Sequence, residues 1–120
     1  MKQVKQSEDQ LQAACVKLFR YQHQPLQWSF FSVPNGGLRN VKVAMKLKST
    51  GALSGVWDMF LSVPKRDKSG MFIEFKVGRN KLTENQISFR NANEEHYHFE
   101  VCYTLDEFQK AINNYLTSKT

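Results

Sequence analysis

Two charged residues interrupt an apolar segment near the middle of the chain, Phe72-Ile73-Glu74-Phe75-Lys76-Val77. Its aromatic and β-branched residues favour a strand. Alternation along that strand places Glu74 and Lys76 on one face and the intervening apolar side chains on the other. Charges inside a sheet are costly unless they are paired or bind a metal. The segment therefore marks a candidate site of chemistry.

Asp58 is a similar anomaly, because it lies in the apolar segment Gly55-Val56-Trp57-Asp58-Met59-Phe60-Leu61. If this segment and the one holding Glu74 pair as a hairpin, the two carboxylates face one spot. They would repel each other, and a divalent cation that binds their oxygens would remove the repulsion. Mg²⁺ is the expected ion, with Mn²⁺ able to substitute. A buried Glu74–Lys76 ion pair, with Asp58 in a turn or cap, is the open alternative.

The hydrophobic pattern predicts how these residues are positioned. Strands are expected at residues 28–33, 56–63, 71–77 and 98–103, and helices at 8–22, 40–49, 83–93 and from 104 onward. Ser7, Thr83 and Thr104 each precede a Gln or Glu by three residues, which is typical of a helix start. This order predicts an α/β fold with helices packed on a mixed four-stranded sheet.

Length and composition narrow the class of protein. The 120 residues predict one domain, with a net charge of +6 and a pI near 9.4. A small basic domain attracts polyanions such as nucleic acid, although many proteins are basic for solubility alone. No apolar run suggests a membrane span or signal peptide. Cys15 and Cys102 lack metal-site spacing and are expected to be buried, reduced thiols, which fits a cytoplasmic location.

Several motifs in order resemble the VRR-NUC family of the PD-(D/E)XK nuclease superfamily. They run from Ser7-Glu8 through Val33-Pro34-Asn35-Gly36-Gly37, Ala44-x-x-Leu47-Lys48-x-x-Gly51, Gly55-Val56-Trp57-Asp58, Glu74-x-Lys76-x-Gly78-Arg79-Asn80-Lys81-Leu82 and Gln86. The resemblance spans about residues 7–116 and implies a restriction-endonuclease-like αβββαβ core with a mixed four-stranded sheet. One position departs from it, because Trp57 stands where the family usually has proline before the aspartate.

The resemblance also implies roles for the site residues. Asp58, Glu74 and the backbone carbonyl of Phe75 would be metal ligands, and Lys76 would hold the attacking water or stabilise charge on the phosphate. Gln86 would lie against the site, although it also fits a helix-capping role. Glu8 would approach from the first helix as a further or water-mediated ligand, although an acid in a first helical turn is favoured in any case.

Within the same interpretation, four residues are expected to contact DNA: Asn35, Lys48, Arg79 and Lys81. Each also has a simpler explanation, as a solvated surface charge or, for Asn35, a turn. Three aromatic residues, Trp28, Phe30 and Phe31, are expected to pack in the core rather than to stack on bases. His96 and His98 lack further ligands and are not expected to bind zinc.

The resemblance extends to stand-alone enzymes of viruses and prophages, which implies the cytoplasm of a bacterial host cell. It suggests a four-way (Holliday) junction endonuclease, and two opposed cuts are best made by a symmetric homodimer. No organic cofactor or membrane partner is expected. Two alternatives stay open: a DNA nuclease without junction preference, and a basic DNA-binding module without catalysis.

Overall fold

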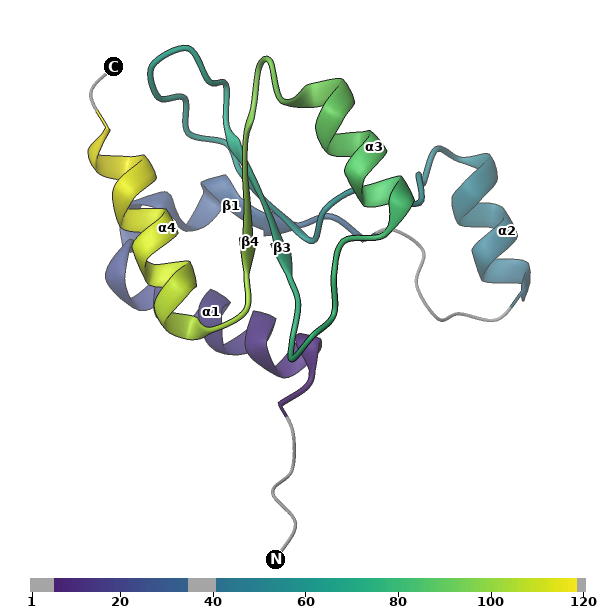
Figure 1. The fold of residues 1–120 in the computed structure, drawn as a ribbon, viewed down its shortest axis with the longest axis horizontal. Helices are drawn as coiled ribbons and strands as arrows, with labels where there is room; N and C mark the ends of the chain where they lie inside the picture. The colour runs from purple at the N-terminus through teal and green to yellow at the C-terminus, as the bar shows by residue number, and fades with distance from the viewer. Residues whose placement is uncertain (1–5, 35–40, 119–120) are drawn as a thin grey trace, which may run out of the picture.

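A computed structural model of the chain describes residues 6–34 and 41–118. Its elements follow the predicted order, with one 3₁₀ helix added (Figure 1). They are α1 (Glu8–Gln22), η1 (Gln24–Ser29), β1 (Phe30–Ser32), α2 (Val41–Ser49), β2 (Met59–Leu61), β3 (Met71–Phe75), α3 (Glu84–Asn93), β4 (His98–Cys102) and α4 (Leu105–Thr117).

The four strands form one mixed sheet in the order β1-β2-β3-β4. β2 and β3 form the predicted antiparallel hairpin, with Met59 opposite Ile73. β3 and β4 are parallel, with Glu74 opposite Val101, and α3 makes the connection that a parallel pair requires. Because β3 lies between β2 and β4, Glu74 is on an interior strand, and the predicted α/β fold is confirmed.

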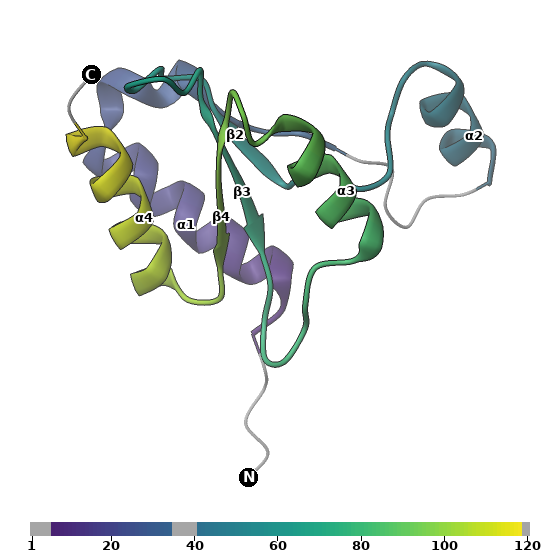
Figure 2. The same ribbon diagram turned by 45° about the horizontal axis from the view of Figure 1, so that its top comes forward.

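Helices cover both faces of the sheet, with α1 and α4 on one side and α3 on the other (Figure 2). The main core lies under α1 and α4, where buried Phe19 and Phe108 both contact the ring of Phe30. The opposite face holds a cluster of aromatic rings in which Phe72 stacks on Phe99 and contacts Phe89 of α3. α2 projects away from the sheet in both views.

Capping fixes where the helices begin. Ser7 and Gln10 form a reciprocal capping box at α1, and Thr83 and Gln86 form another at α3. Both were predicted, and each satisfies backbone N–H groups that have no partner inside the helix. Within the described residues no helix has the length and apolar character needed to cross a bilayer.

The first two predicted strands were too long. Residues 24–29 form a 3₁₀ helix with Pro25 in its first turn, because the ring of proline fixes a helical φ there. Trp28 consequently lies outside the sheet, so its predicted packing in the core is wrong. The same prediction is wrong for Phe31, which is exposed on the short strand β1, and is confirmed for Phe30, which is buried. Residues 56–58 precede β2, since the N–H of Asp58 donates to the side chain of Glu74 and not to a backbone carbonyl of a neighbouring strand. Cys15 and Cys102 are free and buried, as predicted.

Candidate active site

Asp58 and Glu74 are brought together at the point where β2 begins beside β3. The backbone N–H of Asp58 donates a 3.1 Å hydrogen bond to Oε1 of Glu74. In return, Oδ2 of Asp58 accepts a 2.8 Å bond from the backbone N–H of Phe75. The Asp58 carboxylate thus accepts the hydrogen bond from β3 that a backbone carbonyl would accept if β2 were longer. Each of the two carboxyl groups is therefore held by a backbone N–H of the segment that carries the other.

Lys76 and Gln86 complete the surroundings of Glu74. The Nζ of Lys76 lies 3.5 Å from Oε2 of Glu74, as strand alternation predicted. Nε2 of Gln86 donates a 2.9 Å bond to the same oxygen, while its Oε1 accepts from the N–H of Thr83. The amide therefore serves the helix cap and the site at once, one with each end, although the sequence suggested that these roles compete.

Burial sets the electrostatics of this group. Glu74 and Lys76 are 2% and 6% exposed. Burial raises the pKa of Glu74 to about 8, with a further increase from the charge of Asp58 and a smaller opposing effect of Lys76. Burial also raises the pKa of Asp58, against the hydrogen bond from Phe75 that lowers it. Lys76 alone therefore does not offset the cost of ionising Glu74 beside Asp58.

Glu8 reaches the edge of this site from the start of α1. Its charge contributes to the raised pKa of Asp58. Its Oε2 accepts a 3.2 Å hydrogen bond from Nδ2 of Asn80, and the carbonyl of Asn80 accepts one of 2.6 Å from the hydroxyl of Tyr103. Sequence reasoning missed Asn80, although it lies between Arg79 and Lys81, which it did single out.

The aromatic residue before Asp58 anchors α3 to the site. Trp57 is buried, and its Nε1–H donates a 3.0 Å hydrogen bond to the backbone carbonyl of Gln86. Gly55 lies against the same helix, and a Cβ on Gly55 would come within 2.5 Å of the carbonyl oxygen of Asn85. Its φ of +101° is also one that glycine adopts most readily. This loop therefore sets the position of Gln86.

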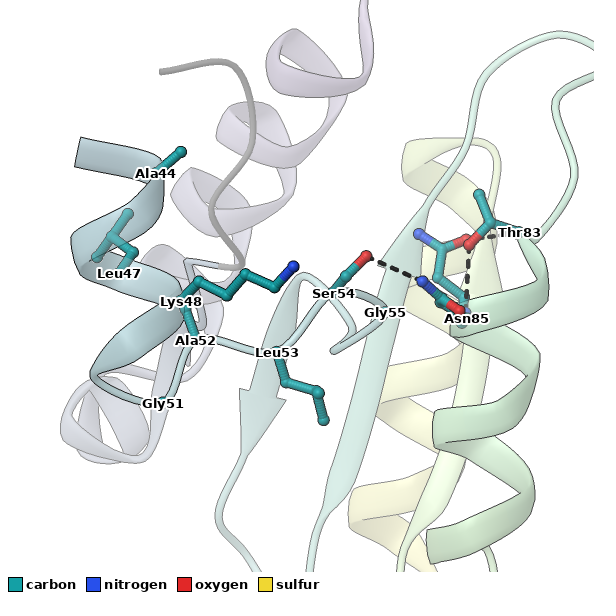
Figure 3. A pocket seen from close by; sticks show the side chains of 11 residues that line it. Ala44, Leu47, Lys48, Gly51, Ala52, Leu53, Ser54, Gly55, Thr83 and Asn85 are labelled. Atoms are coloured by element: carbon teal, nitrogen blue, oxygen red, sulfur yellow. Dashed lines mark hydrogen bonds between the residues drawn. The ribbon is translucent and has the colours of Figure 1, made fainter. Parts of the chain in front are cut away.

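A hollow of about 840 Å³ separates α2 from the start of α3 (Figure 3). Lys48 extends into it from α2, and Asn85 bonds to Ser54 on the opposite side at 3.2 Å. Arg79 and Lys81 are both exposed in the loop after β3. Asn35, the fourth predicted DNA contact, lies outside the described residues. Of these cations, Lys48 shares the hollow with Gln86, and Arg79 and Lys81 lie in the loop that follows Lys76.

The donor set fits a hard divalent cation. An ionised carboxylate offers about four acceptor positions, and Glu74 uses three of them on Asp58, Gln86 and Lys76. In an extended strand the N–H and C=O of one residue point the same way, so the Phe75 carbonyl faces Asp58 as its N–H does. All candidate ligands are oxygens, which Mg²⁺ and Mn²⁺ prefer. Among the described residues, no third acid, histidine or cysteine joins Asp58 and Glu74 in a metal-binding group.

The histidines outside the site have local partners. Nε2 of His98 lies 2.8 Å from Oε1 of Glu100, and His96 is 3.8 Å from Glu95. No cluster of three potential ligands includes either of them in the described parts of the chain.

The mixed sheet carries an acid just before β2 and an acid and a lysine at the end of β3, which agrees with a nuclease domain of the PD-(D/E)XK type. The sequence profile of the VRR-NUC domain matches residues 5–105, and the chain belongs to this family. A solved structure described as a VRR_NUC domain protein superposes with a TM-score of 0.78 at 22% identity, covering 99% of this chain and 93% of that one. At that identity the likeness shows the fold. Comparison with curated proteins gave no match.

Proposed function

We propose that this nuclease domain is a divalent-metal-dependent, structure-selective DNA endonuclease that cuts four-way junctions as a homodimer. The observation that carries the catalytic part is the reciprocal bonding of Asp58 with Glu74 and Phe75, with Lys76 3.5 Å from Glu74. Two neighbouring carboxyl groups beside a lysine are suited to binding a cation and a phosphate.

Asp58, Glu74 and the Phe75 carbonyl would hold the cation. When bound, such an ion acidifies water and stabilises charge on the scissile phosphate. Lys76 supplies a positive charge at the same place, where the negative charge on the phosphate oxygens is stabilised as the bond to the leaving oxygen breaks. Its ammonium is almost fully buried, so the interaction is weakly screened by water and salt.

Gln86 acts through Glu74 as a positioning residue. Its amide holds Oε2 of Glu74 while the cap of α3 holds the amide. Glu8 acts from the edge of the site, where a water between it and a bound ion fits its placement. Lys48, Arg79 and Lys81 contact DNA phosphates and position the substrate without reading sequence.

The junction preference rests on symmetry. A four-way junction has two equivalent strands to cut, and a two-fold dimer presents two identical sites. Charge supports DNA as the partner, since the chain carries +6. A small viral or prophage enzyme acting in the cytoplasm of a bacterial host agrees with this proposal.

The test compares end-labelled four-way junction with linear duplex of the same arms, in Mg²⁺, Mn²⁺ or EDTA. The expected result is metal-dependent junction cleavage at symmetric positions, with a protein that sediments as a dimer. Equal cutting of both substrates would retain the nuclease and refute the junction preference. Metal-independent DNA binding with no cleavage would instead favour a catalytically inactive binding module.

A further inference from the structure

A second groove lies beside the site, between α1 and the segment formed by η1 and β1. It has a volume of about 830 Å³. One wall is the face of α1 that carries Gln12, Lys17 and Arg20, and the other carries Trp28 and Phe31. Its floor includes Met59, whose Sδ accepts a 3.2 Å hydrogen bond from Nε2 of Gln12.

Two residues that line the groove directly follow site residues in the chain. Met59 directly follows Asp58, and Asp9, which lines the same groove, directly follows Glu8. The groove and the candidate active site are therefore built from neighbouring residues of α1 and of the segment that begins β2.

Trp28 is the unusual member of this surface. It is 90% exposed, and Phe31 is 47% exposed, whereas tryptophan normally buries most of its area. The 3₁₀ helix that displaces Trp28 from the sheet presents its ring at the mouth of the groove. A large ring held on an ordered element and exposed to solvent suits stacking against a flat partner.

The charged residues of the groove indicate the chemical class of this flat partner. Lys17 and Arg20 are exposed, and neither forms an ion pair within the described residues. Asp9 is the opposing charge among the lining residues. Cations next to exposed aromatic rings are the combination that binds single-stranded nucleic acid, with phosphates on the cations and bases on the rings.

We infer that this groove binds unpaired nucleotides of the DNA substrate, with Trp28 stacking on a base and Lys17 and Arg20 contacting the adjoining phosphates. The inference rests on the proposed function for its substrate. It names the part of a branched DNA that the enzyme recognises, namely nucleotides unstacked at the branch point.

The test measures binding of labelled oligothymidylate and of four-way junction in EDTA, where no cleavage is needed. Stacking contributes about 1–3 kcal/mol per base, so Trp28→Ala should weaken binding about 5- to 150-fold. Trp28→Phe keeps an aromatic face and should restore most of the affinity. Tyr21→Ala is the matched control, because Tyr21 is 80% exposed on α1 outside the groove, and affinity should change less than about twofold.

Two further measurements distinguish a loss of base stacking from a general loss of DNA affinity. Bound oligothymidylate should quench tryptophan emission in the wild type but not in Trp28→Ala, in which only buried Trp57 remains. Replacing Lys17 and Arg20 by Gln should lower the salt dependence of log K by about 0.7 per lost phosphate contact.

Equal binding by Trp28→Ala and Tyr21→Ala would overturn the inference. A change of oligomeric state in Trp28→Ala would assign the groove to a second copy of the chain and overturn it as well. A protein that binds DNA through Trp28 yet cuts nothing in any metal would retain this inference and refute the proposed nuclease activity.

Discussion

The backbone N–H of Asp58 donates to Oε1 of Glu74 over 3.1 Å, so the position of one acid is tied to the side chain of the other. The Asp58 carboxylate is held in turn by the N–H of Phe75 on the strand that carries Glu74. This reciprocal arrangement fixes two carboxyl groups close together before any substrate arrives. A site that is already organised needs little rearrangement to bind a cation.

The first prediction concerns stability and pH in the absence of metal. Glu74 has a pKa of about 8 in the fold, against 4.5 as its ordinary value. Between these values the unfolded chain has lost a proton that the folded chain retains, so the free energy of unfolding falls as pH rises from about 4.5 to 8. Urea unfolding in EDTA at pH 5, 6.5 and 8 should show a decrease on the order of a few kcal/mol.

Glu74→Gln should remove most of this pH dependence, because the amide is neutral at every pH tested. Glu84→Gln is the control, since Glu84 is exposed in the first turn of α3. A slope that is the same in Glu74→Gln and the wild type would show that Glu74 is not the titrating group.

The second prediction separates the two functions of Gln86. Gln86→Glu retains an acceptor for the N–H of Thr83, so the cap of α3 should survive with a change in unfolding free energy below about 1 kcal/mol near pH 5. It loses the donor to Oε2 of Glu74 and adds a negative charge there. Cleavage should fall about 10- to 100-fold, as expected for a residue that orients a metal ligand.

The comparison with Gln86→Ala completes this test. That variant loses the cap and the bond to Glu74 together, so both stability and cleavage should fall. Full activity in Gln86→Glu would mean that the bond to Glu74 does not position the site.

The third prediction concerns Trp57, which stands where the family usually has proline. Its side chain is buried and bonds to the carbonyl of Gln86. Trp57→Pro should therefore destabilise this chain by about 3–5 kcal/mol, the usual cost of removing a large buried side chain. Chemical denaturation measures this loss, and an unchanged midpoint would contradict the role assigned to Trp57 in anchoring α3.

Sequence patterns predicted the elements that carry the site because their signals are local. Alternation placed Glu74 and Lys76 on one face, and the capping box placed the start of α3 at Thr83. The hairpin then followed from the turn between two apolar segments, and with it the approach of Asp58 to Glu74.

Other features depend on contacts between distant residues and could not be predicted this way. The bond between Trp57 and Gln86 joins positions 29 residues apart, and that between Glu8 and Asn80 joins positions 72 apart. Trp28 was misplaced because its aromatic neighbours favour a strand, whereas Pro25 starts a 3₁₀ helix just before them. Strand propensity is an average over a segment, and here the fixed φ of Pro25 outweighed it.

Cleavage of four-way junction by wild type and Glu74→Gln, with Mg²⁺ or EDTA, tests the central claim most directly. Wild type should cut only with metal, and Glu74→Gln should be at least about 100-fold slower while binding the junction with unchanged affinity. Glu84→Gln should cut like wild type. Cleavage by Glu74→Gln at the wild-type rate, or wild-type cleavage that persists in EDTA, would contradict a metal-dependent site built on Asp58, Glu74 and Lys76.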